Sequence, residues 1–238
     1  MTILGIETST AVCSVGFARH NSTGTGRQAD GIDLQSEKSI VESHIHSEKL
    51  LTLIQELCDE QTIPLSQVDG VAVSIGPGSF TGLRIGLSTA KGLCAALGKP
   101  LVAVPTFEAV ARSVVLTHPE CEEIIVCIDA KQREYYIGSY ENRTGTVHEV
   151  RAVHTGSLSS ALAAVSAKTV IVTDRPGEVT MESRDSILVE NVLPFCRGDV
   201  IARMAIEQWN AGETKVWEQL EPMYLKDFVV RTQVKSDT

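Results

Sequence analysis

The sequence predicts an α/β protein built from two related halves. Apolar strands alternate with amphipathic helices, which is typical of layered α/β folds. The opening plan of strand, acid, polar turn and strand recurs after residue 120. The 238 residues are 43% hydrophobic and 21% charged, as expected of a globular chain. We place the boundary near residue 105, which gives an N-terminal subdomain, 1–105, and a smaller C-terminal subdomain, 106–238.

In the first half, the sequence predicts a hairpin followed by alternating helices and strands. Apolar runs predict strands, and Leu50, Leu53 and Ile54 mark the apolar stripe of a helix. Gly98 and Pro100 end the next helix. The predicted strands are 2–7, 12–18, 35–42, 68–75 and 101–104, and the predicted helices are 47–61 and 81–97.

The second half repeats the plan less regularly. A helix at 107–116 leads into a strand that ends on Asp129, a polar turn and a returning strand. Asp199 is a candidate helix cap, and Gly212 a helix stop. The predicted strands are 123–129, 135–140, 169–173 and 187–190, and the predicted helices are 157–166 and 199–210.

Composition narrows the class of protein. No apolar run approaches the roughly 20 residues that a membrane helix needs, so we expect a cytoplasmic protein without a membrane partner. The six cysteines form no close pairs and indicate buried small residues rather than zinc ligands. The formal charge of −9, with scattered basic residues, favours contact with nucleic acid through a partner protein.

Glu7, Thr8 and Ser9 form an acid and hydroxyl turn between the first two strands. Such a turn can offer amides and hydroxyls to a phosphate. Hydroxyl side chains also commonly bond to the backbone of their own turn, so a purely structural turn is the alternative.

A glycine-rich segment, GPGSFTGLRIG at 76–86, joins a predicted strand to a helix. Gly76 and Gly78 allow sharp turning and close approach of the backbone, and amides at a helix start can bind an anion. The segment lacks the Gly-Lys-Ser/Thr ending of a phosphate-binding P-loop. Phosphate binding and tight strand–helix packing both fit it.

The helix after this segment carries Gly82, Gly86 and Ala90 at four-residue spacing, on one face. Small side chains allow another helix to approach closely, and that contact would offset the loss of helix propensity at each glycine. The neighbour is either the 47–61 helix of the same chain or a second protein.

Several segments together resemble the TsaB family, also called YeaZ. They are ILGIETS at 3–9, the glycine segment at 76–86 and AKGL at 90–93, with IDAKQRE at 128–134 and EPMYLK at 221–226 as later landmarks. The resemblance is close over residues 1–110 and looser beyond. It implies the actin/Hsp70/sugar-kinase (ASKHA) type of fold, with two related subdomains and the second reduced.

The resemblance also implies a role. TsaB proteins are non-catalytic scaffold or activator subunits that bind the catalytic relative TsaD directly, with TsaE in the complex, for N6-threonylcarbamoyladenosine modification of tRNA. Contact with tRNA is then indirect. The implied interface for TsaD, or for a second copy in a homodimer, comprises Leu50, Leu53, Ile54, Gly82, Gly86 and Ala90.

The chain departs from the catalytic relative where that protein carries a His-Leu-Glu-Ala-His metal motif. Here Thr106 and Val110 replace the two histidines, and neither suits a transition metal. We therefore expect no catalytic residue, metal or cofactor in the chain itself. Glu7, Thr8, Ser9, Gly76 and Gly78 are expected to form a vestigial nucleotide loop, and ATP or ADP would bind, if anywhere, at the interface of the complex.

The alternative is a stand-alone enzyme of the same fold, either a metallopeptidase or a nucleotide-dependent enzyme. The fold often binds ATP, and its family has been grouped with endopeptidases. Thr106 and Val110 argue against the peptidase, and the sequence shows no second glycine-rich loop to support a kinase.

Overall fold

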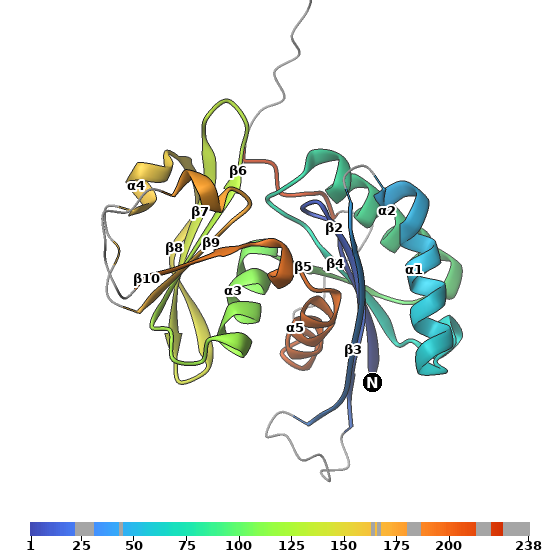
Figure 1. The fold of residues 1–238 in the computed structure, drawn as a ribbon. Helices are drawn as coiled ribbons and strands as arrows, with labels where there is room; N and C mark the ends of the chain where they lie inside the picture. Colours follow the sequence, from blue (N-terminus) through green and yellow to red (C-terminus); the bar gives the residue numbers. More distant parts are fainter. Residues whose placement is uncertain are drawn as a thin grey trace, which may run out of the picture.

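The structure, a computed structural model, describes residues 1–21, 31–42, 45–162, 165, 168–179, 187–212 and 220–225. Its strands form two five-stranded sheets, which Figure 1 shows on opposite sides of the molecule. The first sheet has the order β3-β2-β1-β4-β5 and consists of β1 (Thr2–Glu7), β2 (Val12–His20), β3 (Ile32–Val41), β4 (Gly70–Ser74) and β5 (Leu101–Val104).

The second sheet has the order β10-β9-β6-β7-β8. It consists of β6 (Glu123–Asp129), β7 (Tyr135–Arg143), β8 (Thr146–Gly156), β9 (Thr169–Thr173) and β10 (Ile187–Asn191). Read from the other edge, this order repeats that of the first sheet. In both sheets the first strand pairs antiparallel with the second and parallel with the fourth. The predicted relation between the two halves is confirmed.

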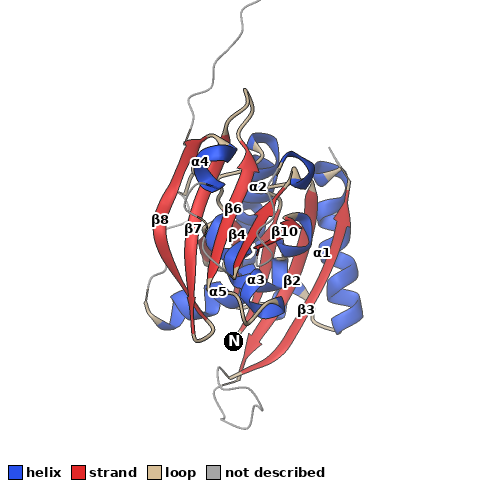
Figure 2. Ribbon diagram, turned by 60° about the vertical axis from the view of Figure 1, so that its left-hand side comes forward, coloured by secondary structure: helices blue, strands red, loops and turns tan. Residues whose placement is uncertain are grey.

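Helices cover both faces of the first sheet. Successive side chains of β1 point to opposite faces of the sheet. Leu4 and Ile6 face the core beneath α1 (His46–Gln61) and α2 (Phe80–Leu97), whereas Ile3 faces α5 (Gly198–Asn210). The second sheet packs against α3 (Thr106–Thr117), and α4 (Leu158–Leu162) lies on its other face. Figures 1 and 2 show α3 and α5 in the layer between the two sheets. This layered α/β arrangement confirms the predicted fold class.

Two glycines of the first sheet let α5 approach it closely. A Cβ on Gly5 would lie 2.0 Å from the carbonyl oxygen of Gly198, and one on Gly16 would lie 2.2 Å from the amide nitrogen of Asp199. Only glycine leaves room for this backbone contact. The C-terminal helix therefore completes the N-terminal sheet, so the predicted boundary near residue 105 separates the strands but not their covering helices.

Several predicted elements differ in detail. The pattern missed β8, because most of its residues are exposed and lack strict alternation. The predicted helix at 157–166 is α4, only five residues long, and part of the predicted span lies outside the described residues. Asp199 is not the N-cap of α5, which begins at Gly198; its carboxylate accepts hydrogen bonds from Arg197, Gln35 and the amide of Val200.

Two expectations from composition can be compared with the structure. All six cysteines are buried and free, as predicted. Among the helices that the structure describes, none combines the length and apolar character needed to span a membrane.

Candidate functional site

The acid and hydroxyl turn after β1 lies inside the molecule. The Glu7 side chain is 1% exposed, and its Oε1 accepts a 2.6 Å hydrogen bond from the amide of Ser9. Burial raises the pKa of Glu7, and the hydrogen bond from the Ser9 amide only partly opposes that shift. The carboxylate is therefore part of a buried polar cluster rather than a group offered to solvent.

The glycine loop, residues 76–79, connects β4 to α2 and packs directly on this turn. The amide of Ser79 donates a 2.6 Å hydrogen bond to the carbonyl of Ser9. A Cβ on Gly78 would lie 2.4 Å from the same oxygen. The five residues predicted to form one vestigial loop are thus brought together in two adjoining turns, but those turns contact each other closely.

Thr106 fixes the other side of the glycine loop. Its hydroxyl accepts a 3.0 Å hydrogen bond from the amide of Gly76, and its own amide donates to the carbonyl of Gly76. Gly76 has φ of +101°, a conformation that favours glycine. Val110, one turn further along α3, is 1% exposed in the core of the second half. Both positions that replace histidines therefore serve packing and loop geometry.

The predicted partner interface requires a correction, because its residues point into the chain. Leu50, Leu53 and Ile54 are 1–2% exposed and pack in the core of the first half. Gly82 and Gly86 lie against Thr8: a Cβ at these positions would be 2.0 Å from its carbonyl oxygen and 2.2 Å from its hydroxyl. Ala90 is also fully buried. The small-residue face of α2 is thus covered by the chain itself, and Gly86→Leu would disturb folding before it tested any interface.

The outward faces of α1 and α2 carry a different set of residues. Leu51 on α1 is 61% exposed. On α2, a second run of small side chains at four-residue spacing faces outward: Ser88, Gly92 and Ala96. A Cβ on Gly92 would meet nothing within 4 Å. Figure 1 shows the two helices side by side on one flank of the molecule.

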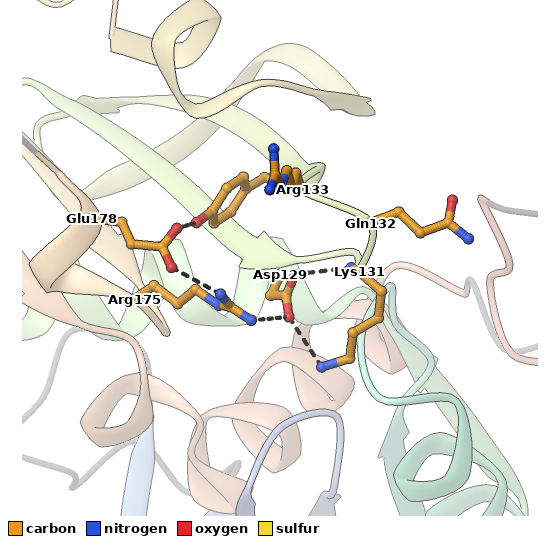
Figure 3. A pocket seen from close by; sticks show the side chains of 7 residues that line it. Asp129, Lys131, Gln132, Arg133, Arg175 and Glu178 are labelled. Carbon is orange, nitrogen blue, oxygen red and sulfur yellow. Dashed lines mark hydrogen bonds and ion pairs between the residues drawn. The ribbon is translucent and has the colours of Figure 1, made fainter.

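A charged hollow of about 550 Å³ lies at the carboxyl ends of β6 and β9 in the second half. Figure 3 shows a chain of alternating charges across it. Arg175 bridges Asp129 and Glu178, with nitrogen–oxygen distances of 2.7 and 2.8 Å. Lys131 binds the same Asp129 carboxylate at 3.0 Å, and the Tyr135 hydroxyl donates a hydrogen bond to Glu178.

The turn at the rim of this hollow has an unusual backbone. Lys131, Gln132 and Arg133 have φ values of +64°, +59° and +66°, so three consecutive non-glycine residues are left-handed. Strained backbone of this kind concentrates at functional sites. Desolvation favours a higher pKa for Asp129, but hydrogen bonds from Lys131 and Arg175 outweigh it and hold the pKa below its ordinary value. The Asp129 carboxylate therefore stays charged and anchors the turn.

Sequence reasoning missed this hollow for two reasons. Lys131 and Arg133 come from one turn, whereas Arg175 follows β9, so only the sheet brings the three cations together. Acidic partners interleave with the cations, so the hollow is no uniformly basic surface. Within the described ranges, no three His, Cys, Asp or Glu side chains gather as a metal site would require.

Comparison with known proteins shows the family to which the chain belongs. The family model described as "TsaD: tRNA N6-adenosine threonylcarbamoyltransferase" matches residues 40–180. The chain belongs to this family. A Bartonella bacilliformis tRNA N6-adenosine threonylcarbamoyltransferase of the family is 36% identical, over 50% of this chain and 35% of that protein.

Other relatives match over greater lengths. The Escherichia coli K12 protein TsaB, named for tRNA threonylcarbamoyladenosine biosynthesis, is 27% identical and 96% of each chain is covered. TsaB of Haemophilus influenzae is 29% identical over 57% of this chain, and the match spans about half of that relative, 52%. YeaZ of Pseudomonas aeruginosa superposes with a TM-score of 0.78 at 27% identity, over 94% of this chain and 99% of that one. The resemblance to TsaB and YeaZ, and the two-subdomain ASKHA-like fold that it implied, are confirmed.

Proposed function

We propose that this chain is a non-catalytic accessory subunit in tRNA N6-threonylcarbamoyladenosine synthesis, acting in the cytoplasm. It binds a larger TsaD-type relative directly, in a complex that includes TsaE, and meets tRNA through that complex. The names of the near full-length relatives support the pathway. A role without catalysis is supported by Thr106 and Val110, which stand where the catalytic motif has histidines and are used for loop geometry and core packing.

The observation that carries the docking role is the open outer face of α1 and α2. Leu51 gives this face one exposed apolar side chain, and Gly92 lets a partner backbone approach without obstruction. Close backbone approach at small residues is a common device of helix–helix packing. The same face offers a surface for a second copy of the chain when TsaD is absent.

The test is a reconstitution that compares two glycine-to-leucine variants. Gly92→Leu adds an isobutyl group to the proposed interface, at a position with free space in the chain itself. Gly177→Leu adds the same group in the other half, also in free space, and serves as the control. Binding to TsaD would be measured by calorimetry, and tRNA threonylcarbamoylation with TsaD and TsaE present and each component omitted in turn.

We expect Gly92→Leu to weaken TsaD binding at least tenfold and to lower modification in parallel, because a leucine prevents the close approach. Gly177→Leu should behave as the unmodified chain. Full modification without this chain would contradict the accessory role. Unchanged binding by Gly92→Leu would contradict this interface while leaving the role intact.

A stand-alone enzyme is the second candidate, because a Pseudomonas aeruginosa neighbour with TM-score 0.79 is described as similar to "peptidase YEAZ". Metal analysis of the purified chain tests this candidate for a metallopeptidase, and calorimetry with ATP tests it for a nucleotide-dependent enzyme. Stoichiometric zinc or iron, or saturable ATP binding by the isolated chain, would favour it.

A further inference from the structure

The last described segment of the chain, residues 221–225, crosses the glycine loop; we call it the C-terminal strap. It starts from Leu220, whose side chain is 8% exposed and anchored in the core of the first half. The next apolar side chains are much more open: Met223, Tyr224 and Leu225 are 37%, 43% and 38% exposed. The strap therefore has one buried anchor and a surface portion that contributes little to the core.

Its backbone binds where β4 becomes the glycine loop. The amide of Met223 donates a 2.7 Å hydrogen bond to the carbonyl of Ile75. The carbonyl oxygen of Met223 lies 3.3 Å from the place where a Cβ of Gly76 would stand. The strap thus covers the first residues of the loop from outside.

Its side chain contacts involve the first turn of α2. The ring of Tyr224 packs on Phe80 with centroids 5.2 Å apart and an interplanar angle of 40°. Arg84 places its guanidinium carbon 3.8 Å from the centre of the Phe80 ring and donates a 3.0 Å hydrogen bond from Nε to the Tyr224 hydroxyl. These three side chains form a surface stack that fastens the strap.

The glycine loop does not depend on the strap for its own shape. Below the strap, Ser79 and Gly76 hydrogen-bond to Ser9 and Thr106, and these contacts involve none of the strap residues. Exposed segments held by few contacts open locally at a small fraction of the cost of global unfolding. The strap can therefore leave while the loop and the core remain folded.

We propose that the C-terminal strap is a detachable cover for the glycine loop, fastened by Tyr224 on Phe80 and Arg84. In the covered state the Ile75 carbonyl and the first turn of α2 are occupied. A ligand or partner that contacts Phe80, Arg84 or the outer side of the loop must first displace Tyr224. The cover thus controls access to the one segment that joins β4, the hydroxyl turn and α2.

Hydrogen exchange on the full-length free chain tests the cover. Tyr224→Ala removes the ring and the hydroxyl, Tyr224→Phe keeps the ring, and Leu188→Ala, which truncates a 41% exposed side chain on β10, is the control. We expect exchange of the Met223 amide, which bonds to the Ile75 carbonyl, to rise about tenfold in Tyr224→Ala, the effect of losing one ring stack and one hydrogen bond, while the amides of residues 76–83 keep their protection. Tyr224→Phe should show a smaller rise and Leu188→Ala none there, with the melting temperature nearly unchanged in all three.

Two results would overturn the proposal. Unaltered exchange at the Met223 amide in Tyr224→Ala would mean that the stack does not hold the cover. Faster exchange that spreads into β1 and β4, with a lower melting temperature, would mean that the strap is an integral part of the core. The readout needs no partner, so it does not depend on the proposed accessory role.

Discussion

Single buried residues determine the shape of the region around the hydroxyl turn. Gly78 and Gly82 bring their backbones against Ser9 and Thr8, at distances that exclude even a methyl group. Thr106 supplies the hydroxyl that holds Gly76. These contacts pack the glycine loop closely against the hydroxyl turn and α3.

Glu7 gives a prediction at this scale, in the dependence of stability on pH. Its pKa is raised on folding, from an ordinary value of 4.5, so the folded chain holds this proton more tightly than the unfolded chain. The contribution of Glu7 to stability is therefore fully present below pH 4.5 and is lost as pH rises toward the folded pKa. Glu7→Gln keeps an oxygen that can accept from Ser9 and removes the titration.

We expect Glu7→Gln to be more stable than the parent at pH 7 and to lose that advantage as pH falls toward 4.5. The difference in the free energy of unfolding between the variant and the parent should change by at most about 1.4 kcal/mol per pH unit. Urea unfolding between pH 4 and 8 measures it, with the exposed Glu120→Gln as the control for simple loss of a charge. A difference that is independent of pH would contradict a buried, titrating Glu7.

At the scale of elements, equivalent turns of the two repeats have different structures. The turn after β1 is buried beneath the glycine loop, whereas the turn after β6 is exposed beside the charged hollow. The second turn holds Lys131, Gln132 and Arg133 in left-handed conformations through the Asp129 carboxylate. Hydrogen bonds and ion pairs to Asp129 hold this strained backbone in place.

A glycine at the centre of this turn should relieve the strain. We expect Gln132→Gly to raise the free energy of unfolding by about 1 kcal/mol, because glycine adopts positive φ without a Cβ clash. Gln55→Gly, the same change on the exposed face of helix α1, should lower it by about 1 kcal/mol. Thermal or urea unfolding of both variants measures the contrast, and destabilisation of equal size at both positions would show that the turn is unstrained.

At the scale of the whole molecule, the two halves are interleaved. Helix α5 comes from the C-terminal half of the sequence and packs on the first sheet, whereas α3, which begins that half, packs on the second sheet. Arg112 on α3 forms ion pairs with Glu108 and with Glu207 of α5, which links the two central helices. The first half of the sequence therefore lacks one of the helices that cover its own sheet, and the second half supplies it.

This interleaving predicts how fragments behave. Residues 1–105 alone should fail to fold stably, because the face lined by Ile3, Ala72 and Val102 loses the cover of α5. The same fragment joined by a flexible linker to residues 196–212 should recover a cooperative thermal transition. Circular dichroism and dye binding to exposed apolar surface measure both. A stable, cooperative 1–105 fragment would show that the sequence boundary is also a folding boundary.

The sequence by itself determined the α/β class, the repeated plan of strand, acid, polar turn and strand, and most strands and helices, because apolar periodicity depends only on near neighbours along the chain. Its segments also determined the resemblance to TsaB. Spacing alone did not determine which glycine face of α2 is buried, since Gly82 with Gly86 and Ser88 with Gly92 both recur every four residues.

Only the tertiary structure decided how these elements are used. In the folded chain Gly82 and Gly86 lie buried against Thr8, whereas Gly92 is exposed. Helix α5 packs on the first sheet, far from it in sequence. The tertiary structure also brought Arg175 to the turn of Lys131 and fastened Tyr224 over Phe80. These contacts join residues far apart in sequence, and their geometry depends on close packing of the whole chain rather than on any local pattern.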